Sequence, residues 1–174
     1  ISGSLPRGVD PSYYRELFRA VDPRSLRIAD AEGARLFAAL EAGIDLVKPN
    51  LEELEFTLGR QIKDKDDMLA GCRELLERGA KIVFLSLGKD GAVITDGKNN
   101  YYCKSINVAV NSTVGAGDGM VAAAAMALKQ GASLKDILRA GVAAGTATVT
   151  TFGTISFTKN KYEEILAGLS VSEF

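Results

Sequence analysis

N-S-T-V-G-A-G-D, residues 111–118, is followed almost at once by an apolar, alanine-rich segment, Met120–Leu128. This order predicts a glycine turn that leads into a helix, whose first backbone N–H groups have no partner within the helix. Such N–H groups bind anions such as phosphate, and glycine lets a phosphoryl group approach the backbone closely. The same pattern also serves ordinary turns, so the spacing alone leaves phosphate binding and a structural turn both open.

Asp118 closes this stretch, at the start of the predicted helix. Beside a bound phosphate, its carboxylate is placed to take a proton from an incoming hydroxyl group. The backbone N–H groups of Gly115, Ala116 and Gly117 would stabilise charge on the phosphoryl group during transfer. We therefore predict Asp118 as the catalytic base, while a simple electrostatic role at the helix N-terminus remains the structural alternative.

The composition excludes several classes of function. The chain has 174 residues, 47% of them hydrophobic and 25% charged, and a net charge of −1, which gives no electrostatic reason to bind nucleic acid or a membrane surface. Its longest apolar run is too short to span a bilayer, and no signal-peptide pattern is present. Cys72 and Cys103 are isolated and predict reduced thiols. With no histidine, Ser-His-Asp hydrolysis is excluded. We expect a cytoplasmic protein.

Turn and cap signals divide the chain into alternating helices and strands. Helices are predicted over Ser12–Ala20, with Asp10 as N-cap, and over Glu32–Ala42, Leu51–Leu58, Asp66–Arg78, Met120–Leu128, a segment capped by Ser133, and Lys161–Leu169. Strands are predicted within Ser25–Ala29, Ile44–Val47 and Lys81–Leu87, and a hairpin over Gly91–Thr95 and Tyr101–Ser105, after which Ile106–Val110 continues the apolar alternation. This order predicts one α/β unit with a parallel sheet covered on both faces.

T-x-G-A-G-D (113–118) resembles the second signature of the phosphofructokinase B family, the ribokinase-like carbohydrate kinases. Four more segments match the family in order: S-G-S-L-P (2–6), K-P-N-x-x-E (48–53), S-L-G-K-D-G-A (86–92) and G-V-A-A-G (141–145). The resemblance implies a three-layer α/β/α fold with a mostly parallel sheet. It covers residues 1–174 as the C-terminal, nucleotide- and Mg²⁺-binding part of the kinase domain, with the family's N-terminal half and lid missing. It also implies a homodimer if the full chain carries the lid.

Asn50 and Glu53 are, by this resemblance, the residues that place Mg²⁺ and its waters, and Lys48 lies near the nucleotide phosphates. By the same resemblance, Asp30, at the end of the first predicted strand, would join this metal network. From the residues alone, Asn50 is also a good N-cap and Glu53 completes a capping box, so a purely structural role is the alternative reading.

The resemblance places the ATP site at the end of a buried strand, where ligands bind in open α/β sheets. Ser86, Gly88 and Gly91 would line this site, while the alternative reading is a strand-to-hairpin turn. Ser112, Gly145 and Thr148 would border the nucleotide.

Ser2, Gly3 and Ser4 are the predicted substrate-binding residues, because G-S-L-P-x-G resembles the branch that acts on phosphorylated hexoses, such as 1-phosphofructokinase and tagatose-6-phosphate kinase. Gly119 departs from this branch, which often has Ser there. The implied function is Mg²⁺-dependent transfer of a phosphoryl group from ATP to a hydroxyl of fructose 1-phosphate, fructose 6-phosphate or tagatose 6-phosphate. A ribokinase- or nucleoside-kinase-like enzyme, a catalytically incomplete ATP-binding fragment and a structural domain that binds no nucleotide are the alternatives.

Overall fold

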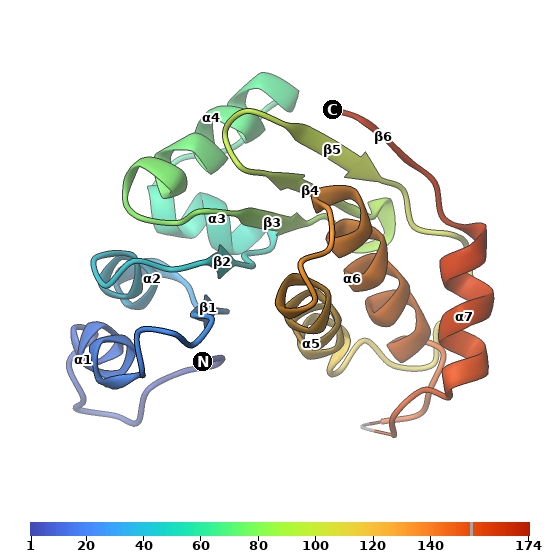
Figure 1. Ribbon diagram of the computed structural model, residues 1–174, viewed down its shortest axis with the longest axis horizontal. Coiled ribbons are helices and arrows are strands. Elements are labelled where there is room, and N and C mark those ends of the chain that lie inside the picture. Colours follow the sequence, from blue (N-terminus) through green and yellow to red (C-terminus); the bar gives the residue numbers. More distant parts are fainter. Residues whose placement is uncertain (154) are drawn as a thin grey trace. The chain divides into compact units, whose positions relative to one another are not determined.

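The computed structural model describes residues 1–153 and 155–174, and the contacts among them divide the chain into two compact units. The first unit comprises Ile1–Ser86 and Thr95–Asn99, and the second comprises Leu87–Ile94 and Asn100–Phe174. Figure 1 shows both units as helices and strands that alternate along the chain. Each unit is described separately below.

The first unit contains three parallel strands in the order β1-β2-β3. These strands span Ile28–Ala29, Leu46–Val47 and Val83–Ser86, and the helices α1 to α4 span Tyr13–Ala20, Gly33–Leu40, Leu51–Leu58 and Lys65–Glu77. Ile28 lies opposite Leu46, and Val47 lies opposite Val83. The carboxyl ends of these strands therefore lie at one edge, and the residues that follow them become neighbours.

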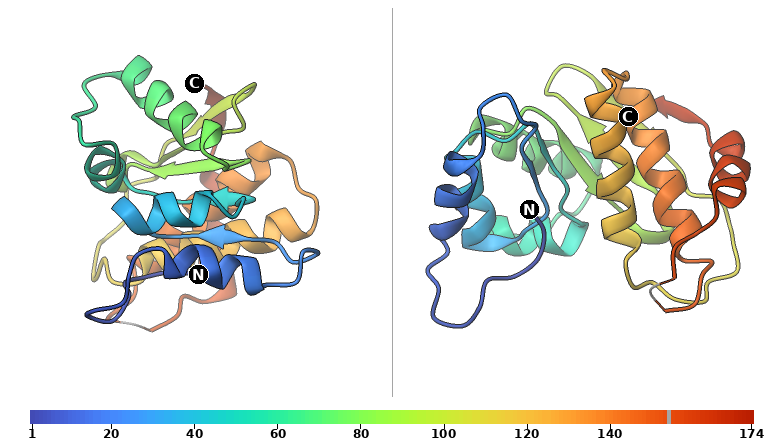
Figure 2. Two further views of the ribbon diagram at one scale, coloured as in Figure 1. Left: turned by 90° about the vertical axis from the view of Figure 1, so that its left-hand side faces the viewer. Right: turned by 60° about the horizontal axis from the view of Figure 1, so that its bottom comes forward.

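The second unit holds β4 (Ala92–Thr95, except its last residue), β5 (Asn100–Cys103), β6 (Val171–Glu173) and helices α5 (Ala116–Lys129), α6 (Leu134–Thr148) and α7 (Lys159–Gly168). β6 was not predicted, and it pairs antiparallel with β5. Helix α6 packs against both α5 and α7, and the right-hand view of Figure 2 shows α5 and α6 side by side. The sheet is therefore mixed, with parallel strands in the first unit and an antiparallel pair here.

Helix caps explain why several helices begin where they do. The side chain of Asn50 accepts from the backbone N–H of Glu53, and that of Ser133 accepts from the N–H of Asp136, as predicted. The prediction of Asp10 as the N-cap of α1 was wrong, since Ser12 occupies that position. Asp10 instead accepts a bond from the Ser12 N–H, because an aspartate readily caps the turn just before a helix.

The segment 106–110 is irregular, although its alternating pattern is typical of a strand. Cys72 and Cys103 are both buried and free, as predicted. Burial raises the pKa of the Cys72 thiol to about 12 and that of Cys103 to about 11, so neither is a reactive thiolate at neutral pH.

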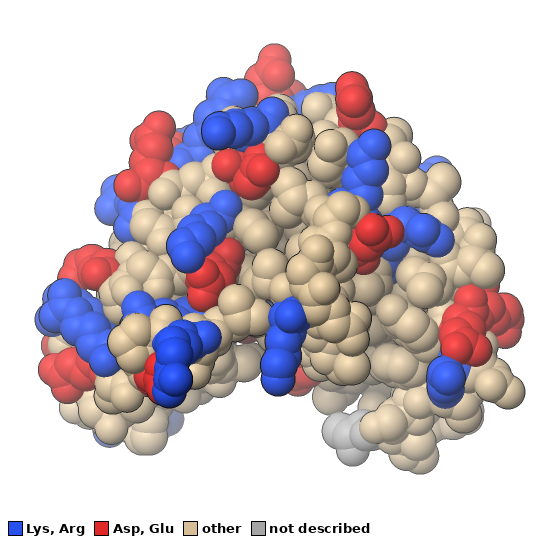
Figure 3. Space-filling view, in the orientation of Figure 1, with Lys and Arg blue, Asp and Glu red and all other residues tan. Residues whose placement is uncertain are grey.

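On the face that Figure 3 shows, Lys and Arg are interspersed with Asp and Glu, and no large patch of a single charge sign is present. None of the helices formed by the described residues combines the length and apolar character needed to cross a bilayer.

Candidate functional site

The predicted site residues fall into two groups, one in each unit. The second unit contains the glycine loop, in which Gly115 has φ +79° and acts as the N-cap of α5. This left-handed conformation strongly favours glycine, because a side chain would clash with the backbone. Asp118 lies in the first turn of α5 with an exposed side chain. The loop therefore places the first N–H groups of a 14-residue helix next to a carboxylate, and one of them, that of Ala116, donates to the Thr113 carbonyl at 3.3 Å.

A cavity of about 910 Å³ lies beside this loop. Gly115, Asp118 and Thr148 line one part of it, and its further walls are formed mainly by apolar side chains of α5, α6 and α7. This volume lies in the range of sites that hold organic cofactors and substrates. The cavity thus brings together two groups of the predicted phosphate-binding loop and one predicted nucleotide contact.

Ser112 is held next to the end of α6. The N–H of Asn111 donates to the carbonyl of Val149 at 2.8 Å, and the Ser112 hydroxyl accepts from the N–H of Val114 at 3.2 Å. The Thr148 hydroxyl donates to the carbonyl of Ala144 at 2.8 Å. The structure therefore brings the loop before α5 and the last turn of α6 together, as a shared nucleotide border requires.

Gly145 has a clear packing role. A Cβ added at Gly145 would lie 2.6 Å from the Met120 Cγ, so the absence of a side chain at residue 145 leaves room for the Met120 side chain of α5. Its contact with a nucleotide stays a prediction.

Thr148 fills the space above Gly119. At position 119 the sequence departs from the branch that acts on phosphorylated hexoses, which often has Ser there. A Cβ added at Gly119 would lie 2.7 Å from the Thr148 Oγ1, which is held by its bond to Ala144. We expect Gly119→Ala to lower the free energy of unfolding by about 1–3 kcal/mol through overpacking. Urea unfolding measures this change.

The Thr148→Ala background provides the control for that variant. In that background the Thr148 hydroxyl is absent, so a Cβ at residue 119 no longer clashes with it. The helix propensity of alanine then favours the substitution by about 1 kcal/mol. Gly119→Ala should therefore be neutral or stabilising when Thr148 is alanine. An equal loss of stability in both backgrounds would show that Thr148 is not the cause.

The first unit contains the K-P-N-x-x-E segment directly after β2. The Lys48 ammonium lies 3.2 Å from the Asp30 carboxylate, and the two side chains are only 5% and 13% exposed. Asp30 follows β1 and Lys48 follows β2, so the parallel pairing of these strands makes the two residues neighbours. Lys48 is therefore part of a buried ion pair. Sequence reasoning connected Asp30 with the metal network, whereas the structure pairs it with Lys48.

Asn50 and Glu53 form the capping box of α3. The Asn50 side chain accepts from the Glu53 N–H, and the Glu53 carboxylate accepts from the Asn50 N–H, both at 2.8 Å. No group of three or more Asp, Glu, His or Cys side chains in the described part of the chain is arranged to hold a metal. The pair nevertheless fits Mg²⁺, which takes one or two carboxylates and completes its coordination with water and substrate phosphates.

Glu53→Gln separates the capping role from the metal role. Glutamine also closes a capping box, so the free energy of unfolding should change little. The loss of charge should raise the Mg²⁺ concentration required for half-maximal activity several-fold. A Mg²⁺ titration of activity, with the exposed neighbour Glu52→Gln as control, tests this expectation. An unaltered titration would leave Glu53 with the capping role alone.

Ser86 ends β3 beside Asn50. Its N–H donates to the carbonyl of Pro49 at 3.0 Å, so the predicted ATP-site and metal residues of the first unit are adjacent. The following turn contains Gly88 at φ +58° and Gly91 at φ +95°. A Cβ at Gly91 would lie 2.0 Å from the carbonyl oxygen of Cys103, so the chain passes β5 only with glycine there. The nucleotide contacts of Ser86, Gly88 and Gly91 stay predictions.

Ser2, Gly3 and Ser4 are exposed in the first unit. Ser2 forms a parallel bridge with Asp30, and the N–H of Gly3 donates to the carbonyl of Asp30 at 3.1 Å. The predicted substrate loop is thus bonded to the residue that pairs with Lys48. The structure brings this loop and the Lys48 region together through Asp30.

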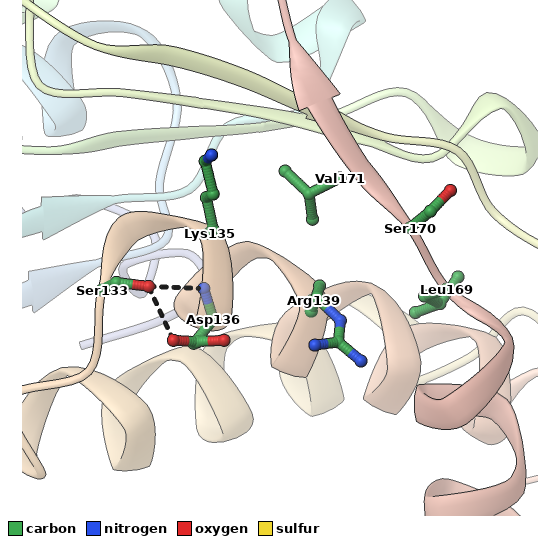
Figure 4. Close-up of a pocket in the computed structure, with 7 residues that line it drawn as sticks. All are labelled: Ser133, Lys135, Asp136, Arg139, Leu169, Ser170 and Val171. Carbon is green, nitrogen blue, oxygen red and sulfur yellow. Dashed lines mark hydrogen bonds between the residues drawn. The ribbon is translucent and has the colours of Figure 1, made fainter.

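A second cavity, of about 400 Å³, lies between α6 and β6. Figure 4 shows that its two cationic side chains, Lys135 and Arg139, point to different sides, and that Ser133 bonds to Asp136. The Lys135 ammonium lies 4.8 Å from the ring centre of Tyr101, and Arg139 donates to the carbonyl of Leu166. Both cations thus have partners, and this cavity does not form a joint anion site.

Comparison with known proteins identifies the relatives of this chain. The model of the pfkB family of carbohydrate kinases matches residues 1–161. The chain is 40% identical over 173 residues to the ATP-dependent 6-phosphofructokinase isozyme 2 of Escherichia coli, covering 98% of this chain and 56% of that protein. It is 35% identical to the 1-phosphofructokinase of Escherichia coli, covering 86% of this chain and 48% of that protein. The chain spans about half the length of these relatives.

A solved structure of phosphofructokinase-2 from Escherichia coli, in complex with substrates and products, is similar in fold. It has a TM-score of 0.88 and 40% sequence identity, with 97% of this chain and 55% of that chain covered. The predicted α/β fold is therefore confirmed, although the sheet contains an antiparallel pair.

Proposed function

Because the chain belongs to the pfkB family of carbohydrate kinases, we propose that it contributes to ATP-dependent phosphoryl transfer to a hydroxyl of a ketohexose phosphate. The observation that supports this most is the start of α5, where Gly115 turns the chain and the first helical N–H groups lie beside Asp118 and a cavity of about 910 Å³. Phosphoryl transfer needs positioning and charge stabilisation more than covalent chemistry, and this arrangement offers both.

Each group at the start of α5 has a proposed role. The N–H groups of Gly115, Ala116 and Gly117 bind oxygens of the transferring phosphoryl group and stabilise its negative charge. Asp118 orients the attacking hydroxyl and accepts its proton as the new O–P bond forms and ADP leaves with the electrons of the broken bond. A carboxylate suffices for this task, because in a loose transition state the hydroxyl loses its proton late.

Asn50 and Glu53 are the proposed holders of Mg²⁺ in the first unit. When bound, this ion neutralises charge on the nucleotide phosphates. The two residues also hold the start of α3 through their reciprocal bonds, so their oxygens keep a defined position. Lys48 forms a buried ion pair with Asp30, and we propose that this pair supports the strand ends that carry the nucleotide residues.

The substrate is proposed to be a phosphorylated ketohexose that contacts Ser2, Gly3 and Ser4. The relatives named 6-phosphofructokinase and 1-phosphofructokinase support this class but differ in the hexose phosphate. The test is ADP production with Mg-ATP and fructose 1-phosphate, fructose 6-phosphate, tagatose 6-phosphate or ribose. Turnover on one phosphohexose supports the proposal, whereas turnover on ribose alone favours a ribokinase-like enzyme.

A second candidate is a nucleotide-binding unit without catalysis of its own. The observation that favours it is the length of the chain, which is about half that of its curated relatives. This candidate predicts saturable Mg-ATP binding by the 174 residues with no turnover on any sugar, and activity only in the protein at its full natural length. A homodimer of that full-length protein stays a prediction.

A further inference from the structure

Tyr14 is a buried tyrosine whose hydroxyl reaches the predicted substrate loop. Its side chain is 1% exposed and packs in the first unit beside Phe18, with ring centres 6.4 Å apart. The hydroxyl donates to the carbonyl of Gly3 at 2.6 Å. Burial raises the pKa of Tyr14, so the group stays protonated and remains a donor at neutral pH. Sequence reasoning missed this residue, because nothing in the helix pattern of α1 marks one of its two tyrosines.

Gly3 is held from two sides. Its N–H donates to the carbonyl of Asp30 at 3.1 Å, and its carbonyl accepts from Tyr14. Gly3 has φ +99°, yet a Cβ added there would meet nothing within 4 Å. The position therefore needs glycine for its backbone conformation rather than for space, and the two bonds hold a peptide that the chain alone would leave adjustable.

The surroundings of Gly3 give these bonds a consequence for binding. Ser2 and Ser4 flank Gly3 and are exposed, whereas of the two residues that hold it Tyr14 is buried and Asp30 is half-buried. Binding loops work when a rigid scaffold fixes their direction before the ligand arrives. Loss of the Tyr14 bond would leave the Gly3 carbonyl without this partner and weaken the hold on the loop, which would then keep only its bridge to Asp30.

We propose that Tyr14 is a positioning residue for substrate binding, which fixes the loop Ser2–Ser4 through its bond to the Gly3 carbonyl. This inference rests on the proposed function, in which that loop contacts the sugar phosphate. Tyr14 does not touch the substrate and takes no part in the transfer of the phosphoryl group. Its effect therefore falls on the affinity for the sugar phosphate and leaves that for ATP unchanged.

The test is Tyr14→Phe in the protein at its full natural length, because phenylalanine keeps the buried ring and removes only the hydroxyl. We expect the KM for the accepted sugar phosphate to rise about tenfold, while kcat and the KM for ATP stay within about twofold. Tyr13→Phe is the matched control, since Tyr13 precedes Tyr14 in α1 but is 44% exposed, and all three constants should stay unchanged in it.

Hydrogen exchange provides a second readout that is independent of activity. The Gly3 N–H should exchange faster in Tyr14→Phe than in the wild type, whereas the amides in the middle of α3 should keep their rates. A rise of both KM values together, or an unchanged KM for the sugar phosphate, overturns the inference alone. No turnover of any sugar phosphate by the wild-type protein overturns the proposed function and the inference with it.

Discussion

Asp118→Asn is expected to lower kcat for phosphoryl transfer by about 10²–10⁴-fold, the range of a lost general base. The amide keeps the size of the side chain and its place in the first turn of α5, but it neither accepts the proton nor carries the negative charge that orients the hydroxyl. The Kd for Mg-ATP should stay within about twofold, because the backbone N–H groups of the loop are unchanged. Steady-state kinetics and calorimetric ATP binding measure the two quantities.

Asp136→Asn is the matched control for this variant. Asp136 lies in the first turn of the neighbouring helix α6, is exposed and lines the same cavity as Asp118. Its substitution removes the same charge at a place where no phosphoryl chemistry is proposed, so kcat should change less than about threefold. Retention of most activity in Asp118→Asn, or an equal loss in both variants, would remove Asp118 from the role of base.

Asp30→Ala is expected to lower the free energy of unfolding by about 3–5 kcal/mol, the cost of leaving one partner of a buried ion pair without the other. The Lys48 side chain is 5% exposed, so water cannot replace the missing carboxylate without local rearrangement. Denaturation by urea, followed by a far-ultraviolet signal, measures this loss, and the parallel strands that carry the pair should unfold at lower denaturant concentration.

Two controls identify the pair as the cause. In Asp30→Ala/Lys48→Met no buried charge remains, and most of the stability should return. Lys81→Ala breaks the pair with Asp45 at the surface, where Lys81 is 76% exposed, and should cost about 1 kcal/mol or less. A double variant as unstable as Asp30→Ala would mean that the unpaired ammonium is not what destabilises the protein.

Local signals predicted the helices better than the strands. The limits of α3, Leu51–Leu58, agree residue by residue, because Asn50 caps its start and Gly59 ends it in a left-handed conformation. The strand β6 was missed, because it has only three residues and forms through its pairing with β5, some 70 positions away in the chain. A short exposed strand carries no periodic pattern of its own.

In the candidate site, too, features set by neighbouring residues could be predicted, whereas those set by packing between elements could not. The glycine turn that leads into a helix could be predicted, since the geometry of a helix N-terminus depends on consecutive residues, although α5 begins at Ala116 rather than at the predicted Met120. The space that Thr148 fills above Gly119 could not be predicted, because it depends on how α5 packs against α6. Gly115 and Gly119 look alike in the sequence, yet Gly115 allows the left-handed turn before α5, whereas Gly119 allows close packing against Thr148.

The sequence by itself determined the family motifs, the caps of α3 and α6 and the conformation at Gly115, because each of these depends on residues within one turn of each other. Only the tertiary structure decided that Lys48 pairs with Asp30 and that Tyr14 holds Gly3. Those partners lie on different elements, and they meet because parallel strands align their carboxyl ends and α1 packs over the first unit's core. Contacts between different elements follow from strand pairing and burial, which no local pattern encodes.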